Sequence, residues 1–436
     1  MLYKTGDVLP GTSGLTASAL NDPYTNGLGK VGFNGTVGTD RFIWYDTGVV
    51  WLNSNSVSPV LTGAEGTMGI SNTGGFIYSP SADGNDAVWT QAGLLLADGD
   101  PIPSLGLFSA FNSRPRMVDS GAAFWIGGLS TTAGGSTSNR ALLTTTDPAN
   151  PDIQALIIGG GTYGGLTITT TASNFAFDVS GNGLHRVHVL SATGSTATDS
   201  FVHYSSTDSV IAREGFGIPG STTELWAAFR IPSVNNCGSW AVAGDTNGAV
   251  GEDEIIAYNN QVIVREGEIY NGLQLSGTVN AVSINNRERI AFIFSASPEC
   301  LLAGPAGNFA AEGRVLLRSG DQIDIDGNGS CDFIVTDFNA SNTVAPGLDL
   351  ADDGMVWVSV DLTDCVSGAT HVAIIGLRES CPADFNNSGG APTVQDIFDF
   401  LAAYFNNGPG ADFNGSCVVS VQDIFDFLAA YFAGCA

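Results

Sequence analysis

Short apolar runs, each bounded by glycine, asparagine, aspartate or serine, alternate with tight turns over residues 1–377. In a typical unit the turn Asn72-Thr73-Gly74-Gly75 leads into the run Phe76-Ile77-Tyr78, a second run follows, and a third ends at Asp98-Gly99-Asp100. Short runs of apolar and aromatic residues between turn residues are typical of strands. The pattern therefore predicts a mainly β structure.

The unit recurs along the chain. Turns related to Asn-x-x-Gly stand before an apolar strand, often with Ala-Phe or Trp, at positions 29, 74, 121, 183, 238, 288 and 354, which are 45 to 66 residues apart. The sixth copy has Glu288 in place of the glycine. A unit of this size made of strands and turns predicts blades of about four strands arranged radially, and seven copies predict a seven-bladed β-propeller-like repeat domain. A β-helix or a pair of β-sandwiches is the structural alternative.

The seventh unit lacks the strand that ends at Gly-Asp elsewhere. It offers the strands Met355–Val360 and His371–Leu377, and the chain then passes into the tail. The N-terminal segment has the missing ending at Gly6-Asp7. We therefore expect residues 2–5 to pair with His371–Leu377, which would close the ring and remove an open sheet edge.

The C-terminal residues follow a helical pattern instead. The segment Val394–Phe405 recurs without change as Val421–Phe432. Its main apolar residues fall on one face of a helix, and an acidic loop precedes each copy. We expect a small α-helical module at 381–436, distinct from the β domain at 1–377.

The two acidic loops have the spacing of EF-hand calcium loops, in which oxygen ligands wrap a hard cation. The candidate ligands of the second loop are Asp412, Asn414, Ser416, the carbonyl of Val418, and Asp423. Those of the first loop, which is one residue longer, are Asp384, Asn386, Ser388 and Asp396. Cys417 stands where such loops usually have glycine. We predict that Ca²⁺ binds both loops, the first more weakly, and that so small a module needs it to fold.

This duplicated loop–helix module resembles a dockerin, especially the variety that begins Cys-Pro-Ala-Asp-Phe-Asn and ends Gly-Cys. Here these are residues 381–386 and Gly434-Cys435. The resemblance implies calcium-dependent docking onto a cohesin-like partner on a scaffold or cell surface, and it suggests polysaccharide as a ligand. The Asn-x-x-Gly-x-x-Ala-Phe repeat resembles tandem-repeat surface proteins with interchangeable C-terminal anchors. That second resemblance implies export and anchoring and brings no catalytic residues with it.

A third candidate calcium loop lies inside the β domain, at residues 324–332, and the apolar run Phe333-Ile334-Val335 follows it. Its candidate ligands are Asp324, Asp326, Asn328, Ser330 and Asp332. Because a strand follows, the loop resembles the calcium hairpins between strands of integrin-alpha propellers. A turn of Asp, Asn and Gly without metal is the alternative.

Charge narrows the choice of partners and location. The net charge is −28, and the only lysines are Lys4 and Lys30. An acidic surface repels phosphate backbones, so we do not expect a nucleic acid partner. No apolar stretch is long enough for a transmembrane segment, and the N-terminal residues lack a signal-peptide core. We nevertheless expect an extracellular or cell-surface protein whose signal peptide is removed or missing, because the dockerin-like tail makes sense only outside the cytoplasm.

The seven cysteines suit an exported protein. We expect a disulfide between Cys381 and Cys435, which bracket the duplicated module. A second is expected between Cys300 and Cys331, which flank one hairpin. The odd number leaves at least one thiol free or paired between chains.

No motif identifies a catalytic site. There is no nucleophile elbow, phosphate loop or dinucleotide fingerprint in strand–turn–helix context. His185 and His188 are three residues apart, so in a regular strand they point to opposite faces and do not share a zinc ion. The leading hypothesis is a non-catalytic surface, adhesion or carbohydrate-binding propeller with a calcium-dependent anchor. The alternative is a polysaccharide-degrading enzyme, a glycoside hydrolase or lyase, with its active site in the propeller channel.

Overall fold

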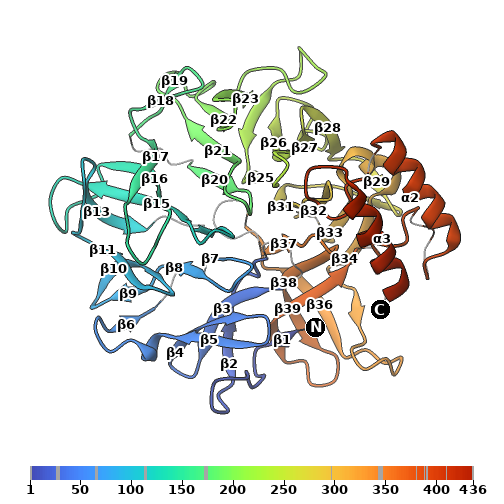
Figure 1. The fold of residues 1–436 in the computed structure, drawn as a ribbon, viewed down its shortest axis with the longest axis horizontal. Helices are drawn as coiled ribbons and strands as arrows, with labels where there is room; N and C mark the ends of the chain where they lie inside the picture. Colours follow the sequence, from blue (N-terminus) through green and yellow to red (C-terminus); the bar gives the residue numbers. More distant parts are fainter. Residues whose placement is uncertain are drawn as a thin grey trace.

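Seven antiparallel β-sheets form a ring around a central axis, and two helices pack against one side of the ring (Figure 1). The seven-bladed β-propeller expected from the repeat is therefore confirmed. The computed structural model describes residues 2–25, 30–63, 67–111, 115–170, 175–295, 297–341, 347–379, 381–386, 388, 391–408 and 410–434.

The blades follow one another along the chain. Blade 1 contains β2 (Ala17–Leu20), β3 (Gly32–Val37), β4 (Asp40–Tyr45) and β5 (Gly48–Leu52), and blade 2 contains β6 (Leu61–Thr62), β7 (Met68–Ile70), β8 (Phe76–Tyr78), β9 (Ser81–Ala82), β10 (Asn85–Thr90) and β11 (Gly93–Ala97). Blade 3 contains β12 (Pro101–Ile102), β13 (Gly106–Phe111), β14 (Arg116–Met117), β15 (Ala123–Ser130), β16 (Asn139–Thr145) and β17 (Gln154–Ile158). Blade 4 contains β20 (Ala176–Val179), β21 (Arg186–Ser191), β22 (Ser200–Tyr204) and β23 (Ser209–Arg213).

Blade 5 contains β24 (Trp226–Phe229), β25 (Ser233–Val234), β26 (Trp240–Thr246), β27 (Glu254–Tyr258) and β28 (Gln261–Arg265). Blade 6 contains β31 (Val279–Ile284), β32 (Arg289–Phe294), β33 (Cys300–Pro305) and β34 (Arg314–Arg318). Blade 7 contains β35 (Gln322–Ile323), β36 (Phe333–Phe338), β37 (Leu348–Leu350), β38 (Met355–Asp364), β39 (Thr370–Arg378) and β1 (Tyr3–Lys4). The connections include the ribbons β18 (Thr162–Tyr163) with β19 (Leu166–Thr167) and β29 (Ile269–Tyr270) with β30 (Leu273–Gln274), the 3-10 turns η1 (Asn53–Asn55) and η2 (Ala306–Asn308), and the short helix α1 (Phe309–Glu312).

Within a blade the strands are stacked from the central axis to the rim (Figure 1). In blade 5, β24 and β25 pair with β26, β26 pairs with β27, and β27 pairs with β28. In blades 2, 4, 5, 6 and 7 the outermost strand is the one whose sequence ends at Gly-Asp or Glu-Gly. Its pairing with the third strand carries a register shift in blades 1 to 6, such as that between Ile256 and Ala257. Such bulges increase the local twist of the sheet.

The ring closes as the sequence predicts. β1 pairs with β39 in the register Tyr3↔Ile374 and Lys4↔Ala373. The Leu2 N–H donates to the Ile374 carbonyl at 2.9 Å, and β1 thereby becomes the outermost strand of blade 7. The N-terminus and the last β-strand thus share one sheet.

The hydrophobic core is divided among the interfaces between neighbouring blades. Seven clusters of buried side chains each join two adjacent blades. The cluster between blades 7 and 1 places Trp357 and Ile374 with Phe33 and Trp44, so the ring closes by packing as well as by hydrogen bonds. Because both faces of a blade are covered, its strands are continuous apolar runs, such as Ile290–Phe294, rather than alternating ones.

The tail contains the two expected helices, α2 (Val394–Asn406) and α3 (Val421–Ala433), which lie beside the sheet of blade 6 in Figure 1. Each begins with a capping box, in which Thr393 or Ser420 exchanges hydrogen bonds with the aspartate three residues later. The rings of Phe400 and Phe427 stack at 4.3 Å with an interplanar angle of 7°. These two residues are equivalent in the duplicated sequence, which indicates an approximate two-fold relation between the helices. Among the described residues, no helix is long and apolar enough to cross a membrane.

The disulfides differ in part from the expected pairing. Cys331 bonds to Cys365, not to Cys300, which is a free buried thiol, so that prediction is wrong. The reason is that Cys300 packs its side chain into the core between blades 5 and 6, whereas the pairing of β36 with β38 brings Cys331 beside Cys365. Cys381 is disulfide-bonded as expected, and its predicted partner, Cys435, lies outside the described residues.

Candidate functional site

The recurring Asn-x-x-Gly turn has a structural role at the centre of the ring. It joins the first two strands of a blade and bonds to the same turn of the next blade. The Asn236 N–H donates to Asn286 Oδ1 at 2.7 Å, and the Asn286 N–H donates to Asp352 Oδ1 at 2.7 Å. The buried Asn285 side chain accepts two N–H groups of its own turn and donates to the carbonyl of Ala351 at 2.8 Å. The repeat signature is thus a ladder of hydrogen bonds from blade to blade.

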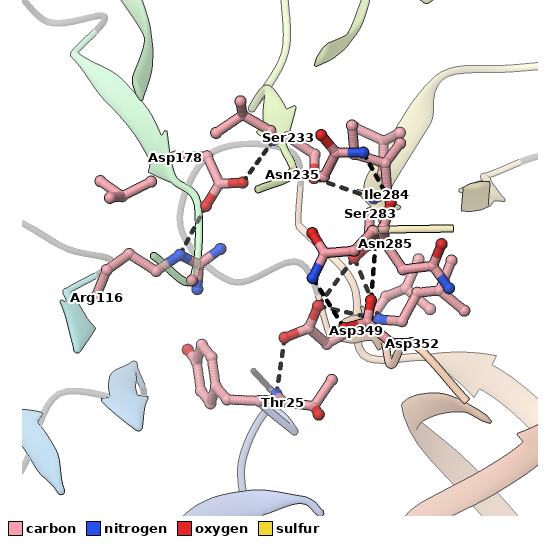
Figure 2. Close-up of a pocket in the computed structure, with 18 of the residues that line it drawn as sticks. Thr25, Arg116, Asp178, Ser233, Asn235, Ser283, Ile284, Asn285, Asp349 and Asp352 are labelled. Atoms are coloured by element: carbon pink, nitrogen blue, oxygen red, sulfur yellow. Dashed lines mark hydrogen bonds and ion pairs between the residues drawn. The ribbon is translucent and has the colours of Figure 1, made fainter. Parts of the chain in front are cut away.

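The central channel is filled by ion-paired polar side chains (Figure 2). Arg116 of β14 donates from Nε to Asp178 Oδ1 at 2.7 Å, and Asp178 also accepts a backbone N–H from β25. Asp349 of β37 accepts the Thr25 N–H and the Ser283 hydroxyl. Burial raises the pKa of Asp349, and the positive charge of Arg116 opposes that rise.

The cavity that remains in the channel measures about 70 Å³. Pockets that take small-molecule ligands usually measure several hundred cubic ångströms. The channel carboxylates Asp178 and Asp349 already accept hydrogen bonds from protein groups, and the cavity beside them is too small for a sugar ring. The described residues therefore give no geometric support to a polysaccharide-cleaving site in the channel.

The second tail loop brings its five predicted ligand residues together. The Ser416 N–H donates to Asp412 Oδ1 at 2.9 Å, and the Ser416 hydroxyl donates to the Val418 carbonyl at 3.1 Å. The Asn414 N–H donates to Asp423 Oδ1 at 3.1 Å, which ties the start of the loop to the buried first turn of α3. Burial raises the pKa of Asp412, and the neighbouring Asp423 carboxylate raises it further. This convergence of oxygen atoms around two carboxylates fits a hard cation such as Ca²⁺.

The first tail loop repeats this arrangement. The Ser388 N–H donates to Asp384 Oδ1 at 2.8 Å, and the Asn386 N–H donates to Asp396 Oδ1 at 3.2 Å. Asp396 is fully buried, like Asp423 in the second loop. Burial alone would raise the pKa of Asp396, but N–H donors from Thr393 and Asn386 outweigh it and lower the pKa. The extra residue of the first loop therefore does not displace Asp396 from the role of Asp423.

The hairpin loop 324–332 joins β35 to β36, so a strand follows it as expected. Carboxylate oxygens of Asp324, Asp326 and Asp332 lie within 4.8 Å of one another. Asn328 and Ser330 complete the turn, in which the Ser330 N–H donates to Asn328 Oδ1 at 2.7 Å. The loop is exposed to solvent, and three backbone N–H groups already satisfy Asp324. Its geometry fits both a calcium hairpin and a turn held by its own hydrogen bonds.

Each tail helix also presents large apolar side chains to solvent. On α2 these are Val394, Phe398 and Phe405, and on α3 the equivalent Val421, Phe425 and Phe432, each at least 60% exposed. Large exposed apolar side chains on one helix make these faces candidates for a contact surface. The duplicated sequence therefore yields two nearly equivalent exposed faces on one small module.

The tail is fixed to the propeller on the side of its second loop. A disulfide joins Cys237, in the turn of blade 5, to Cys417, which is 180 residues later. The guanidinium of Arg287, in the turn of blade 6, lies 4.4 Å from the centre of the Phe413 ring. The sequence contained a signal for this bridge, since Cys417 replaces the usual glycine of the loop, but it did not show the partner.

A groove of about 680 Å³ separates the tail from blades 5, 6 and 7. Apolar side chains line it from both sides, including Tyr258 of β27, Pro305 of β33, and Phe385 of the first loop. Asp384 and Asp412, the first ligands predicted for the two loops, also line it. The groove is therefore bordered by the propeller and by both acidic loops.

The partner of His188 is His203, not His185. His188 of β21 does not share a site with His185; it pairs across the hairpin with His203 of β22, with 3.1 Å between the two Nδ1 atoms. His203 Nε2 contacts Asp208 at 2.9 Å. Burial lowers the pKa of His188 well below its usual value, and the neighbouring His203 lowers it further, so the His188 imidazole is neutral at pH 7. Among the described residues, these histidines do not belong to a group of three side chains close enough together to share one metal ion.

No family model and no curated protein matches the chain. Among solved structures, the β-propeller domain of the Trilobed protease from Pyrococcus furiosus is 10% identical, with a TM-score of 0.46 over 82% of this chain and 95% of that one. A prolyl endopeptidase is 12% identical, with a TM-score of 0.42 over 83% of this chain and 47% of that one. The acylaminoacyl peptidase of Pyrococcus horikoshii is 10% identical, with a TM-score of 0.42 over 81% and 52%. This chain spans about half the length of those two peptidases.

At such identities the similarity concerns the fold alone, and the peptidase names carry no argument about this chain. The strand pairing and the tail together define the class: a seven-bladed β-propeller with a duplicated helical module held to it by a disulfide.

Proposed function

We propose that residues 381–436 are a calcium-binding, dockerin-like module that attaches an exported, non-catalytic β-propeller to a cohesin-like partner on a scaffold or cell surface. The observation that supports this proposal best is the duplication itself. Two acidic loops with the same pattern of hydrogen bonds lead into two identical helical segments with the same exposed apolar residues. A helical hairpin with a purely structural role would need neither two acidic loops nor two equivalent sets of exposed apolar side chains.

Calcium would resolve an electrostatic conflict in the second loop. Asp412 and Asp423 repel each other while both are charged, and burial together with the Asp423 carboxylate raises the pKa of Asp412. A divalent ion bound between them would convert that repulsion into binding energy, and metal binding of this kind is coupled to folding. In the first loop, Asp384 and Asp396 occupy the equivalent positions and are proposed to bind the ion in the same way.

Calorimetric titration of the full-length protein with Ca²⁺, together with melting curves in calcium and in chelator, tests the proposal. The double variant Asp412→Ala with Asp423→Ala should remove one binding event, and Asp384→Ala with Asp396→Ala should remove another. Asp152→Ala, at an exposed position between β16 and β17 and outside the three acidic loops, is the matched control. If the unaltered protein shows neither binding heat nor a change of melting temperature in chelator, the anchor proposal is wrong.

The hairpin at 324–332 is a separate part of the proposal. The variant Asp324→Ala with Asp326→Ala should remove a third binding event without changing the affinity of the tail loops, because the hairpin is built by blade 7 alone. An unchanged stoichiometry would show that hydrogen bonds alone hold this turn.

The propeller itself is proposed to bind polysaccharide rather than to cleave it. Its channel cavity of about 70 Å³ is too small for a sugar ring, whereas the groove beside the tail measures about 680 Å³ and combines aromatic and polar side chains. Incubation with insoluble polysaccharides, followed by measurement of both depletion from solution and release of reducing ends, separates binding from cleavage. Release of reducing ends by the protein would favour the enzyme instead.

A further inference from the structure

Three residues of the propeller contact the second loop of the tail. Cys237 bonds to Cys417, Asn286 lies against Gly415, and Arg287 lies over Phe413. We propose that Cys237, Asn286 and Arg287 are positioning residues that hold the second loop in the form in which its carboxylates converge, so that the propeller sets the calcium affinity of that loop. The inference rests on the calcium binding proposed above and adds a role for residues outside the tail.

Two irregularities of the sequence meet at this contact. The second loop has Cys417 where calcium loops have glycine, and Cys417 has a φ of +71°, which glycine adopts freely and other residues adopt at a cost. The turn of blade 6 has Glu288 where most turns of the repeat have glycine, and Glu288 has a φ of +58°. Each position departs from its own repeat although the backbone would favour glycine. The disulfide to Cys237 supplies a reason for the departure at Cys417, whereas Glu288 accepts a hydrogen bond from Asn235 of blade 5 at 3.1 Å.

The disulfide acts on the peptide group that orients a predicted ligand. The Cys417 N–H donates to Asp412 Oδ2 at 2.6 Å, and the neighbouring Ser416 N–H donates to Asp412 Oδ1 at 2.9 Å. Both N–H groups follow Gly415, where an added Cβ would lie 2.7 Å from the Asn286 side chain. The loop therefore rests directly on the propeller, and its N–H groups are held toward Asp412 before a cation arrives.

The other side of the contact belongs to the ladder of the ring. Asn286 accepts the Asn236 N–H and donates to Asp352, so it joins blades 5, 6 and 7 while it supports Gly415. Coupling between two sites is reciprocal. Calcium at the second loop should therefore stabilise this part of the ladder, and the intact ladder should strengthen calcium binding.

The first loop provides an internal reference. It has the same hydrogen bonds to its two aspartates as the second loop. In the sequence its position equivalent to Cys417 is Gly389, which lies outside the described residues. A substitution that releases the second loop from the propeller should leave calcium binding at the first loop unchanged.

The test uses the full-length protein and Ca²⁺ as the probe. The variant Cys237→Ser with Cys417→Gly removes the disulfide and also gives the loop its usual glycine, so backbone strain is not the cause of any loss. Arg287→Gln removes the contact with Phe413. The control is Arg213→Gln, which removes a similar contact between an arginine and a phenylalanine ring, 5.0 Å from Phe216 in blade 4, and leaves the tail contact intact. Calcium affinity is measured by calorimetry, and hydrogen exchange of residues 412–418 is measured in chelator.

We expect the disulfide variant to lose affinity at the second loop by about 5- to 150-fold, the usual range of coupling between sites. Arg287→Gln should show a smaller loss, and the control none. Exchange in residues 412–418 should be faster in the disulfide variant even without calcium. Unchanged affinity and unchanged exchange in that variant would overturn the inference while leaving the calcium proposal intact. Absence of calcium binding in the unaltered protein would instead overturn both.

Discussion

Replacing Asn285 with alanine should destabilise the propeller strongly, although this residue touches no ligand. Its side chain is 3% exposed, and it makes three hydrogen bonds. Oδ1 accepts the N–H groups of residues 287 and 289 at 3.0 Å each, and Nδ2 donates to the Ala351 carbonyl of the next blade at 2.8 Å. Alanine leaves all three partners without the bond, and each buried group left unsatisfied costs about 1–3 kcal/mol. Because the two N–H groups lie near solvent, we expect a total of about 3–5 kcal/mol.

The free energy of unfolding should be measured from guanidinium titrations followed by tryptophan fluorescence. Native proteins have only about 5–15 kcal/mol of stability, so the expected loss is easily resolved. Asn55→Ala, at an exposed asparagine of the first blade, is the matched control and should change stability by less than about 0.5 kcal/mol. If Asn285→Ala loses no more than the control, the repeat signature does not act through this ladder, and a ligand role for the turns would have to be reconsidered.

Three further predictions concern the ring closure and two buried titrating groups. Deleting residues 2–5 should expose β39 as an edge strand, lower the melting temperature and cause concentration-dependent aggregation, which light scattering detects. Burial and His203 lower the pKa of His188 in the folded chain, so below about pH 6.5 only the unfolded chain takes up the proton. Stability should therefore fall as the pH drops below about 6.5. His188→Gln should make the melting temperature depend less on pH in this range. Burial and the neighbouring Asp337 raise the pKa of Glu299 to about 7, so the folded chain keeps a proton that the unfolded chain loses near its ordinary value of 4.5. Stability from this group should therefore fall as the pH rises from 4.5 to about 7, and Glu299→Gln should raise the melting temperature at pH 8.

The architecture of the ring could be predicted because its signals are local and repeated. A turn related to Asn-x-x-Gly marks each unit, most units also end at Gly-Asp or Glu-Gly, and the same ending at Gly6-Asp7 identified β1 as the missing strand of blade 7. Without a further strand, blade 7 would have an open sheet edge, and the N-terminal segment can remove that edge by pairing with β39. The two helices of the tail were predictable for the same reason, since their twelve-residue duplication carries its own periodicity.

The contacts between distant segments could not be predicted in the same way. Cys237 and Cys417 are 180 residues apart, and the local sequence around either cysteine does not indicate which cysteine it pairs with. The expected bridge from Cys300 to Cys331 failed because sequence proximity said nothing about which face of a strand each thiol occupies. The pairing of His188 with His203 depended on the register of one hairpin, which the sequence left open.

The way the tail is fixed also limits how a partner can hold the propeller. Asp384 and Asp412 border the groove toward the blades, whereas Phe398 and Phe425 are exposed on the helices. A module hanging from one flexible linker would let the propeller rotate freely about its anchor. Here the disulfide at Cys417 adds a second attachment, so rotation about the linker is blocked. A partner that engages the exposed face of α2 or of α3 would therefore hold the propeller in one of two orientations, related by the two-fold symmetry of the module.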